Sequence, residues 1–146
     1  MSAIAKDLSE LVESLGVPEP LRTAVPRLRV AYHDACSLQH GQKVRAPARL
    51  LLRAAGFEVV DIPEGHLCCG SAGTYSALKP KTAAELGRMK AETISRTGAQ
   101  AVAMANIGCM EQIAQYSAVP TLHTVELLDW ATGGPKPAAL AKLAVG

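Results

Sequence analysis

AVAMANI, residues 101–107, is an apolar run that contains a single polar side chain, Asn106. An apolar run of this length, bounded by turn residues, is typical of a β-strand that is covered on both faces. Three other short segments are rich in β-forming residues: 28–33 (LRVAYH), 57–62 (FEVVDI) and 120–124 (PTLHT). The sequence therefore predicts four strands.

Helical segments separate the predicted strands. Residues 47–55 place small and apolar side chains on one face, which is typical of a helix packed on a sheet. Residues 82–97 begin with Thr-Ala-Ala-Glu, a capping-box pattern. Further helices are predicted near 110–116, at 125–131 and in the alanine-rich C-terminus. Because alternating strands and helices form right-handed crossovers, we predict a three-layer α/β fold, with a mostly parallel four-stranded sheet and helices on both faces.

The N-terminal segment differs from the rest of the chain. Residues 2–15 predict an amphipathic helix that Ser2 can cap and Gly16 ends. Its apolar positions are Ile4, Leu8, Leu11, Val12 and Leu15. Three prolines then interrupt regular structure in residues 17–27. We therefore divide the chain into an N-terminal helix with a proline-rich linker, residues 1–27, and a single globular domain, residues 28–146.

Charge and hydropathy exclude several classes of protein. The 15 basic and 13 acidic residues give a net charge of +2, and the basic residues are scattered. This pattern argues against a nucleic-acid-binding protein, which concentrates basic residues on one surface. No apolar stretch approaches the ~20 residues that cross a bilayer, and the N-terminus does not resemble a signal peptide. We expect a cytoplasmic location, where thiols stay reduced, so the four cysteines indicate metal or redox chemistry.

The cysteines all follow predicted strands. Cys36 follows the strand at 28–33, Cys68 and Cys69 follow the strand at 57–62, and Cys109 follows AVAMANI. Loops after parallel strands emerge at one edge of a sheet, where ligands bind in open α/β folds. We therefore expect the four thiols to gather at the carboxyl ends of the strands and to hold one metal centre.

The neighbouring residues suit thiolates. Cys109 is predicted near a helix N-terminus, where the helix dipole would lower its thiol pKa. Gly70 and Gly73 can bring backbone N–H groups close to sulfur or to an inorganic cluster. Four thiolates satisfy either an iron–sulfur cluster or a tetrahedral zinc ion, and the long spacing favours the cluster. In an oxidised protein, Cys68 and Cys69 could instead form a disulfide with each other or with another cysteine.

The histidines are weaker candidates. His123 lies at the end of the last predicted strand and is our candidate for contact with a cofactor or its ligands. His33 is interpreted as a packed histidine that bonds the backbone. His40 is interpreted as a solvated loop residue that could alternatively cap a cluster sulfur. Asn106 is expected to turn the chain before Cys109.

The cysteine pattern resembles that of the CCG domain family, which is named for its Cys-Cys-Gly. The family pattern is one cysteine, a gap, Cys-Cys-Gly, a second gap and Cys-x-x-Cys. The surrounding stretches AYHDACSLQHGQ (31–42), LCCGSAGTYS (67–76) and ANIGCME (105–111) are similar to those of glycolate oxidase-type iron–sulfur subunits. Gln112 replaces the last cysteine of the final motif, as it tends to be replaced in that subgroup. The resemblance therefore implies four thiolate ligands and a single cluster of the 4Fe-4S type.

The resemblance also implies a function. It implies an electron-transfer domain, residues 28–146, of an oxidoreductase complex whose FAD-binding subunits oxidise a 2-hydroxy acid and whose acceptor is a molecule such as quinone. No complete substrate-binding site is recognised in this sequence. The chain resembles the C-terminal domain of a longer subunit, and peripheral membrane association of the parent complex stays open. Two alternatives also stay open: a thiol–disulfide module similar to heterodisulfide reductase, and a zinc-binding structural or interaction domain.

Overall fold

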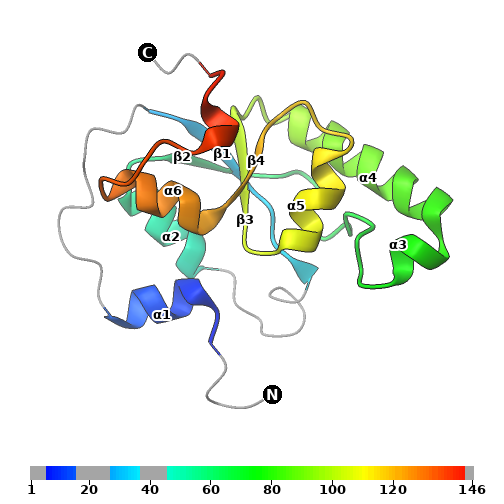
Figure 1. Cartoon of the computed structure of the whole chain (residues 1–146), viewed down its shortest axis with the longest axis horizontal. Coiled ribbons are helices and arrows are strands. Elements are labelled where there is room, and N and C mark those ends of the chain that lie inside the picture. Colours follow the sequence, from blue (N-terminus) through cyan, green and yellow to red (C-terminus); the bar gives the residue numbers. More distant parts are fainter. Residues whose placement is uncertain (1–5, 16–26, 37–45, 144–146) are drawn as a thin grey trace.

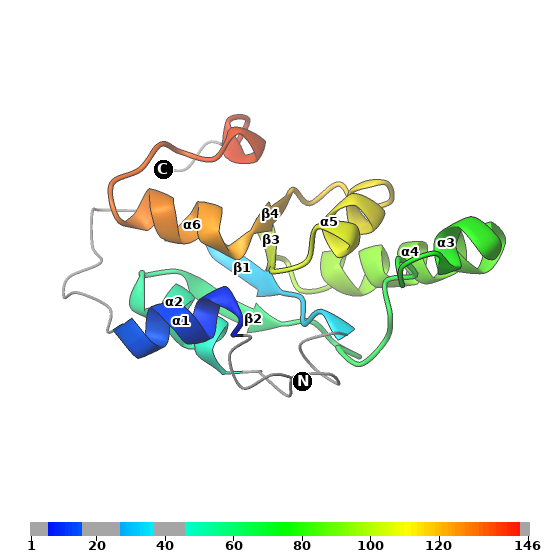
Figure 2. The same ribbon diagram turned by 60° about the horizontal axis from the view of Figure 1, so that its bottom comes forward.

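The computed structural model describes residues 6–15, 27–36 and 46–143 and contains one parallel β-sheet (Figures 1 and 2). Its strands are β1 (Arg29–Tyr32), β2 (Glu58–Asp61), β3 (Ala101–Met104) and β4 (Thr121–His123). The strand order is β2-β1-β3-β4, and every pair is parallel. All four strands lie within the predicted segments, so the predicted α/β fold is confirmed.

Helices cover both faces of the sheet. They are α1 (Leu8–Leu15), α2 (Pro47–Ala54), α3 (Tyr75–Leu78), α4 (Pro80–Ser95), α5 (Ile107–Ala114) and α6 (Thr124–Ala131), followed by the 3₁₀ turn η2 (Ala138–Leu140). Figure 1 shows α1, α2 and α6 on one side of the strands and α3, α4 and α5 on the other. The order of the strands explains the placement of α2, α4 and α5, because the crossover from β1 to β2 runs in the opposite direction to those from β2 to β3 and from β3 to β4, and right-handed crossovers in opposite directions lie on opposite faces.

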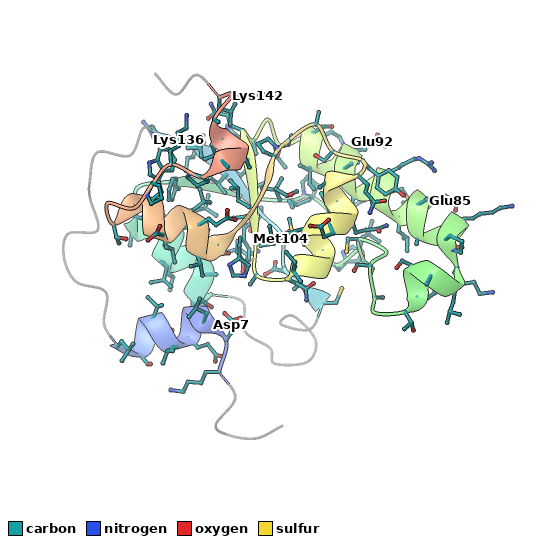
Figure 3. All side chains as sticks on the ribbon, viewed as in Figure 1. Asp7, Glu85, Glu92, Met104, Lys136 and Lys142 are labelled. Carbon is teal, nitrogen blue, oxygen red and sulfur yellow. The ribbon has the colours of Figure 1, made fainter. Side chains whose placement is uncertain are left out.

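Strand β3 is central because it contributes to two separate cores. Ala101 and Ala103 pack with the side chains of α2 and α6, whereas Val102 and Met104 pack with those of α4 and α5. Successive side chains of a strand point to opposite faces, so an apolar run is what a doubly covered strand requires. Met104 is fully buried and lies at the centre of the fold (Figure 3).

Two helix starts have clear local causes. The Asn106 side chain caps α5 by accepting a hydrogen bond from the backbone N–H of Cys109 at 3.1 Å, which confirms its predicted structural role. His123 caps α6, where its Nδ1 accepts from the N–H of Val125 and Glu126 accepts from the N–H of His123. Caps of this kind satisfy backbone donors that lack a partner inside the helix.

Several local predictions are wrong. Helix α4 begins at Pro80, ahead of the predicted capping box at residues 82–85, and has no side-chain cap, because proline at the first position already fixes a helical φ angle. Helix α3 was not predicted. In the C-terminus, residues 138–140 form only a 3₁₀ turn, since Pro135 and Pro137 interrupt a longer helix.

The N-terminal helix is shorter in the structure than in the prediction. Asp7 caps α1 by accepting from the N–H of Ser9 at 2.9 Å, and Leu8 and Leu11 are 45% and 42% exposed. Ser2, Ile4, Gly16 and residues 17–26 lie outside the described residues, so the division of the chain at residue 27 stays a prediction. Among the described helices, none has the length and apolar character needed to cross a bilayer.

Candidate metal centre

Three buried side chains from distant parts of the chain meet beside the sheet. His33 directly follows β1, Cys69 lies in the loop between β2 and α3, and Cys109 is in the first turn of α5. One ligand atom from each residue lies within 4.8 Å of the other two, and all three residues are buried. Among the described residues, this is the one group of three or more histidine, cysteine or acidic side chains with metal-binding geometry.

The four thiols interact as two linked pairs. Cys69 and Cys109 share a hydrogen bond between their sulfur atoms in the buried pair. Cys36 and Cys68 form a second pair, also joined by a side-chain hydrogen bond, and both are only partly buried. Cys109 is close enough to all three other cysteines for their charges to act on it. The structure thus gathers the sulfur atoms of residues that are far apart in the sequence.

Within the buried pair, one thiol is much more acidic than the other. The hydrogen bond with Cys109 lowers the pKa of Cys69 to about 4, although burial acts in the opposite direction. That same hydrogen bond, with burial and the neighbouring thiolates, raises the pKa of Cys109. The predicted lowering at Cys109 by the helix dipole is therefore wrong, because the adjacent thiolate outweighs the dipole. A pair that shares one proton in this way holds a sulfur anion ready for a cation.

The Cys-Cys-Gly loop brings backbone donors to the sulfur atoms. The N–H of Gly70 donates to Cys68 Sγ at 3.3 Å, and the backbone of Ser71 donates to the Cys69 sulfur. Gly70 has a φ of +89°, and a Cβ atom at this position would lie 2.5 Å from the carbonyl oxygen of Ala83 in α4. Only glycine therefore allows the loop to approach α4 this closely.

Burial of the vicinal cysteines differs although they are neighbours in the sequence. Cys69 is 1% exposed and belongs to the core on the α4 and α5 side, whereas Cys68 is partly exposed and pairs with Cys36. Their side chains leave the backbone in different directions, so one loop supplies a sulfur to each pair. Gly73 is exposed and has open space around it; its predicted role toward a cofactor stays a prediction.

His33 is the residue that the sequence interpretation missed. The imidazole is 1% exposed, and its Nε2 atom has no hydrogen-bond partner among the described residues. It was interpreted as a packed histidine, but its side chain lies beside the sulfur of Cys69 and helps to lower that pKa. The alternation of β1 carries a signal, because His33 follows Tyr32 and so points to the face on which Ala31 packs with Cys69. His40 lies outside the described residues.

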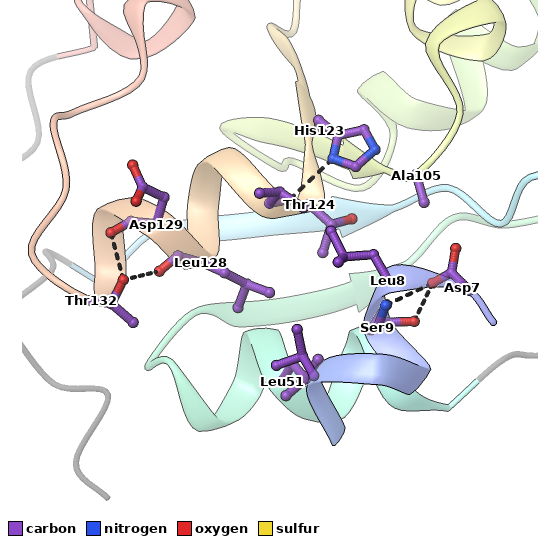
Figure 4. A pocket seen from close by; sticks show the side chains of 13 residues that line it. Asp7, Leu8, Ser9, Leu51, Ala105, His123, Thr124, Leu128, Asp129 and Thr132 are labelled. Atoms are coloured by element: carbon purple, nitrogen blue, oxygen red, sulfur yellow. Dashed lines mark hydrogen bonds between the residues drawn. The ribbon is translucent and has the colours of Figure 1, made fainter. Parts of the chain in front are cut away.

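His123 lies beside a different cavity. A mainly apolar pocket of about 350 Å³ opens between α1, α2 and α6, and His123 and Leu8 are among its lining residues (Figure 4). The Nδ1 atom of His123 accepts the helix-capping hydrogen bond, shown as a dashed line. The predicted contact between His123 and a cofactor stays a prediction.

The donor set fits a soft metal or an iron–sulfur cluster. Thiolate and imidazole are the ligands that zinc and iron–sulfur centres use, and carboxylates are absent from the group. A bound group would give the buried Nε2 of His33 a partner, since an unsatisfied buried polar atom costs about 1–3 kcal/mol. Backbone N–H groups aimed at sulfur are also typical of protein sites that hold iron–sulfur clusters.

Comparison with known families agrees with this geometry. Residues 30–114 match the CCG family, the cysteine-rich domain, and this match spans more than half of the chain. The matched region contains every residue of the metal-binding group. The protein belongs to the CCG cysteine-rich domain family.

Several curated proteins are similar to this chain. The glycolate oxidase iron–sulfur subunit of Escherichia coli (strain K12) is 35% identical over 133 residues, which cover 90% of this chain and 32% of that protein. One subunit of the fumarate reductase (CoM/CoB) of Methanothermobacter marburgensis is 35% identical, with 71% of this chain and 23% of that protein covered. Lactate utilization protein A of Oceanobacillus iheyensis is 30% identical, with 82% and 50% covered. The chain spans half or less of the length of each of these relatives.

Proposed function

We propose that this protein is an iron–sulfur electron-transfer domain of a glycolate oxidase-type oxidoreductase. In this proposal Cys36, Cys68, Cys69 and Cys109 hold one cluster of the 4Fe-4S type. The observation that carries the proposal is the convergence of the four thiols as two interacting pairs, one of them buried and sharing a proton. The names of two relatives, an iron–sulfur subunit and a lactate utilization protein, support the reaction class.

The residues around the thiols would tune such a cluster. When bound, the cluster supplies the site of one-electron storage, and its potential depends on hydrogen bonds to sulfur and on burial. The N–H groups of Gly70 and Ser71 supply those hydrogen bonds. On the inner side, the apolar side chains of Met104 and Ile113 are fully buried in the same core as Cys69, so they exclude water.

The proposal assigns substrate oxidation to other subunits. We infer that the partners are FAD-binding 2-hydroxyacid dehydrogenase subunits and that an acceptor such as quinone takes the electrons. The site described above offers thiols, an imidazole and backbone donors, which suit a cluster and do not form a hydride-transfer site. On this proposal the domain spans residues 28–146, acts in the cytoplasm and does not bind the hydroxy acid.

Anaerobic reconstitution with iron and sulfide tests the assignment. The reduced chain should turn brown and take up about four iron and about four sulfide ions, as one cubane cluster requires. Cys69→Ser should abolish uptake, because it removes the acidic thiol of the buried pair. Ser71→Ala is the matched control, since it changes a nearby loop position and leaves all four thiols in place. A wild-type chain that stays colourless and binds no iron contradicts the proposal.

A zinc site is the second candidate, and one specific observation favours it. The His33, Cys69 and Cys109 group offers nitrogen and sulfur ligands in a compact buried arrangement, which is typical of zinc centres. Elemental analysis of protein that was purified without air separates the two candidates. About one zinc per chain with no iron and no sulfide would support a zinc site.

A thiol–disulfide module is the third candidate. The partly exposed pair of Cys36 and Cys68 is the observation that favours it, because thiol exchange requires access from solvent. Thiol trapping across a redox titration tests this candidate. Reversible loss of two thiols at one potential, in protein that holds no iron, would support it over an electron-transfer role.

A further inference from the structure

We propose that Lys90 supplies a buried positive charge to the metal centre and thereby raises the reduction potential of the cluster held there. This inference rests on the proposed function and assigns a role to a residue outside the ligand set. Lys90 lies in α4, the helix that packs beside the Cys-Cys-Gly loop.

The position of Lys90 in α4 is unusual for a lysine. Its side chain is 1% exposed and is the largest of the fully buried side chains among the described residues. The buried positions of α4 form one face: Ala83, Gly87, Lys90, Ala91, Thr93 and Ile94. By contrast, Glu85 and Glu92 are exposed, and Figure 3 shows them on the outer side of the helix. Lys90 therefore points into the protein on the side where Ile94 packs in one core with Cys69 and Cys109.

The Lys90 ammonium group has few hydrogen bonds and lacks a carboxylate partner among the described residues. Nζ donates one long hydrogen bond, 3.4 Å, to the backbone carbonyl of Glu64. Among the described residues, no carboxylate lies within 4.0 Å of Nζ. A buried ammonium group is costly unless a counter-charge and hydrogen bonds compensate for its lost hydration.

The sulfur atoms are the anions that compensate this charge. Burial lowers the pKa of Lys90, whereas thiolates at Cys69, Cys36 and Cys68 and the exposed Glu64 carboxylate act in the opposite direction. The loop that carries Glu64 leads into Cys68 and Cys69, so the same segment holds the ammonium group and supplies the thiolates. The ammonium group thus lies within electrostatic reach of three of the four sulfur atoms.

A cation in this position has a predictable effect on redox chemistry. Adding an electron makes a thiolate-bound cluster more negative, and a nearby positive charge stabilises the reduced form more than the oxidised form. The interaction is strongest with Cys69, because Lys90 and Cys69 are both buried. Removal of the charge should therefore shift the midpoint potential to a more negative value. A lysine with only a packing role would change stability and leave the potential unchanged.

Three variants of the full 146-residue chain test this inference. Lys90→Met removes the charge and preserves the length of the side chain, and Lys90→Gln removes the charge but keeps a hydrogen-bond donor. Lys81→Met is the matched control, because Lys81 is an exposed lysine of the same helix. For each chain we would measure the unfolding free energy without metal, the iron content after anaerobic reconstitution, and the midpoint potential with redox mediators.

We expect Lys90→Met and Lys90→Gln to be less stable than the wild type without metal, because the buried Cys69 thiolate loses its nearby positive charge. After reconstitution, both should have a midpoint potential more negative than that of the wild type. Lys81→Met should match the wild type in all three measurements.

Each contrary result has a distinct meaning. Lys90 variants that load with iron and share the wild-type potential overturn this inference and leave the proposed function intact. A wild-type chain that takes up no iron overturns both. If Lys90→Met takes up no iron, Lys90→Arg decides the matter: recovery of iron uptake by the arginine but not by Lys90→Gln supports the role of charge, and recovery by both overturns it.

Discussion

The two faces of the sheet bury different kinds of side chains, although the same strands supply both. The core under α2 and α6 contains leucine, valine, alanine and aromatic side chains, and a mainly apolar pocket opens beside it. The core under α4 and α5 contains Cys69 and Cys109, and the buried side chains of His33, Lys90 and Gln112 lie with it. The sheet thus buries mainly apolar side chains on one side, and thiol, imidazole, ammonium and amide groups on the other.

The two faces therefore contribute differently to the stability of the domain and to its candidate site. Apolar packing stabilises a domain through burial, whereas a buried polar group without a partner destabilises it. The α2 and α6 face follows mainly the first rule, although the buried Thr124 hydroxyl at the start of α6 also lacks a hydrogen-bond partner among the described residues. The α4 and α5 face keeps a partnerless Nε2 atom and an ammonium group without a nearby carboxylate, which is consistent with a face that holds a ligand. Four substitutions test this difference between the two faces.

Leu127→Ala tests the apolar face. Leu127 is fully buried in α6, so its truncation should reduce the free energy of unfolding by about 2–5 kcal/mol. Iron uptake per folded chain should not change, since the side chain belongs to the opposite core. Urea unfolding and iron analysis give the two readouts, and Val125→Ala, at a 36% exposed position of the same helix, is the control. A parallel loss of iron per folded chain would show that the faces are not independent.

Gly70→Ala tests the close approach between the cysteine loop and α4. The new methyl group would meet the Ala83 carbonyl oxygen, and the backbone would be strained at a φ of +89°. Gly73→Ala is the matched control, because Gly73 also has a positive φ, +58°, but has open space around it. The control should lose about 1–2 kcal/mol of stability from backbone strain, and Gly70→Ala should lose more. Equal losses in urea unfolding would contradict the steric argument.

His33→Leu sharpens the assignment of the polar face. It removes the unpartnered Nε2 atom and also the hydrogen bond by which the imidazole lowers the pKa of Cys69, so in the metal-free chain the pKa of Cys69 should rise. Iron should bind about 10–100-fold more weakly, which is the usual cost of losing a residue that supports metal ligands. Chelator competition measures the affinity, with His66→Leu as an exposed control. An unchanged affinity for iron would show that His33 only packs in the core and does not support the metal ligands.

Tyr32→Phe gives the smallest expected effect and concerns the apolar face. Burial raises the pKa of Tyr32 to about 12, whereas the unfolded phenol ionises near pH ~10. The folded state therefore keeps its proton longer, and the stability that this provides is present below pH ~10 and lost between pH ~10 and pH ~12. The phenylalanine variant should lose less stability over that interval than the wild type, as measured by urea unfolding. Identical pH profiles would contradict the burial argument.

Much of the fold follows from the sequence because its signals are local. The AVAMANI run identifies β3, and the alternation of strands with helices leads to the parallel sheet. Element boundaries depend on competing local rules, so Pro80 determines the start of α4 in place of the predicted capping box. The apolar positions of α1 predict a helix correctly, but periodicity alone does not show that Leu15 stays 75% exposed.

The candidate site is less accessible to sequence reasoning because it depends on tertiary contacts. Spacing and motif predict that the cysteines gather, yet they do not reveal which thiols form the buried pair. Lys90 interrupts an apolar stretch in the sequence, and only the packing of α4 shows that its charge is turned inward. The acidity of Cys69 depends on a hydrogen bond from α5, which no local pattern encodes.

Because Cys68 is partly exposed and Cys69 is buried, the site has one sulfur pair near solvent and one enclosed by the core. A reagent that arrives from solvent meets the partly exposed sulfur atoms of Cys36 and Cys68 before the enclosed pair behind them. Two consecutive residues therefore set a direction of approach, so attack by an oxidant or docking of a redox partner begins at one defined rim of the protein.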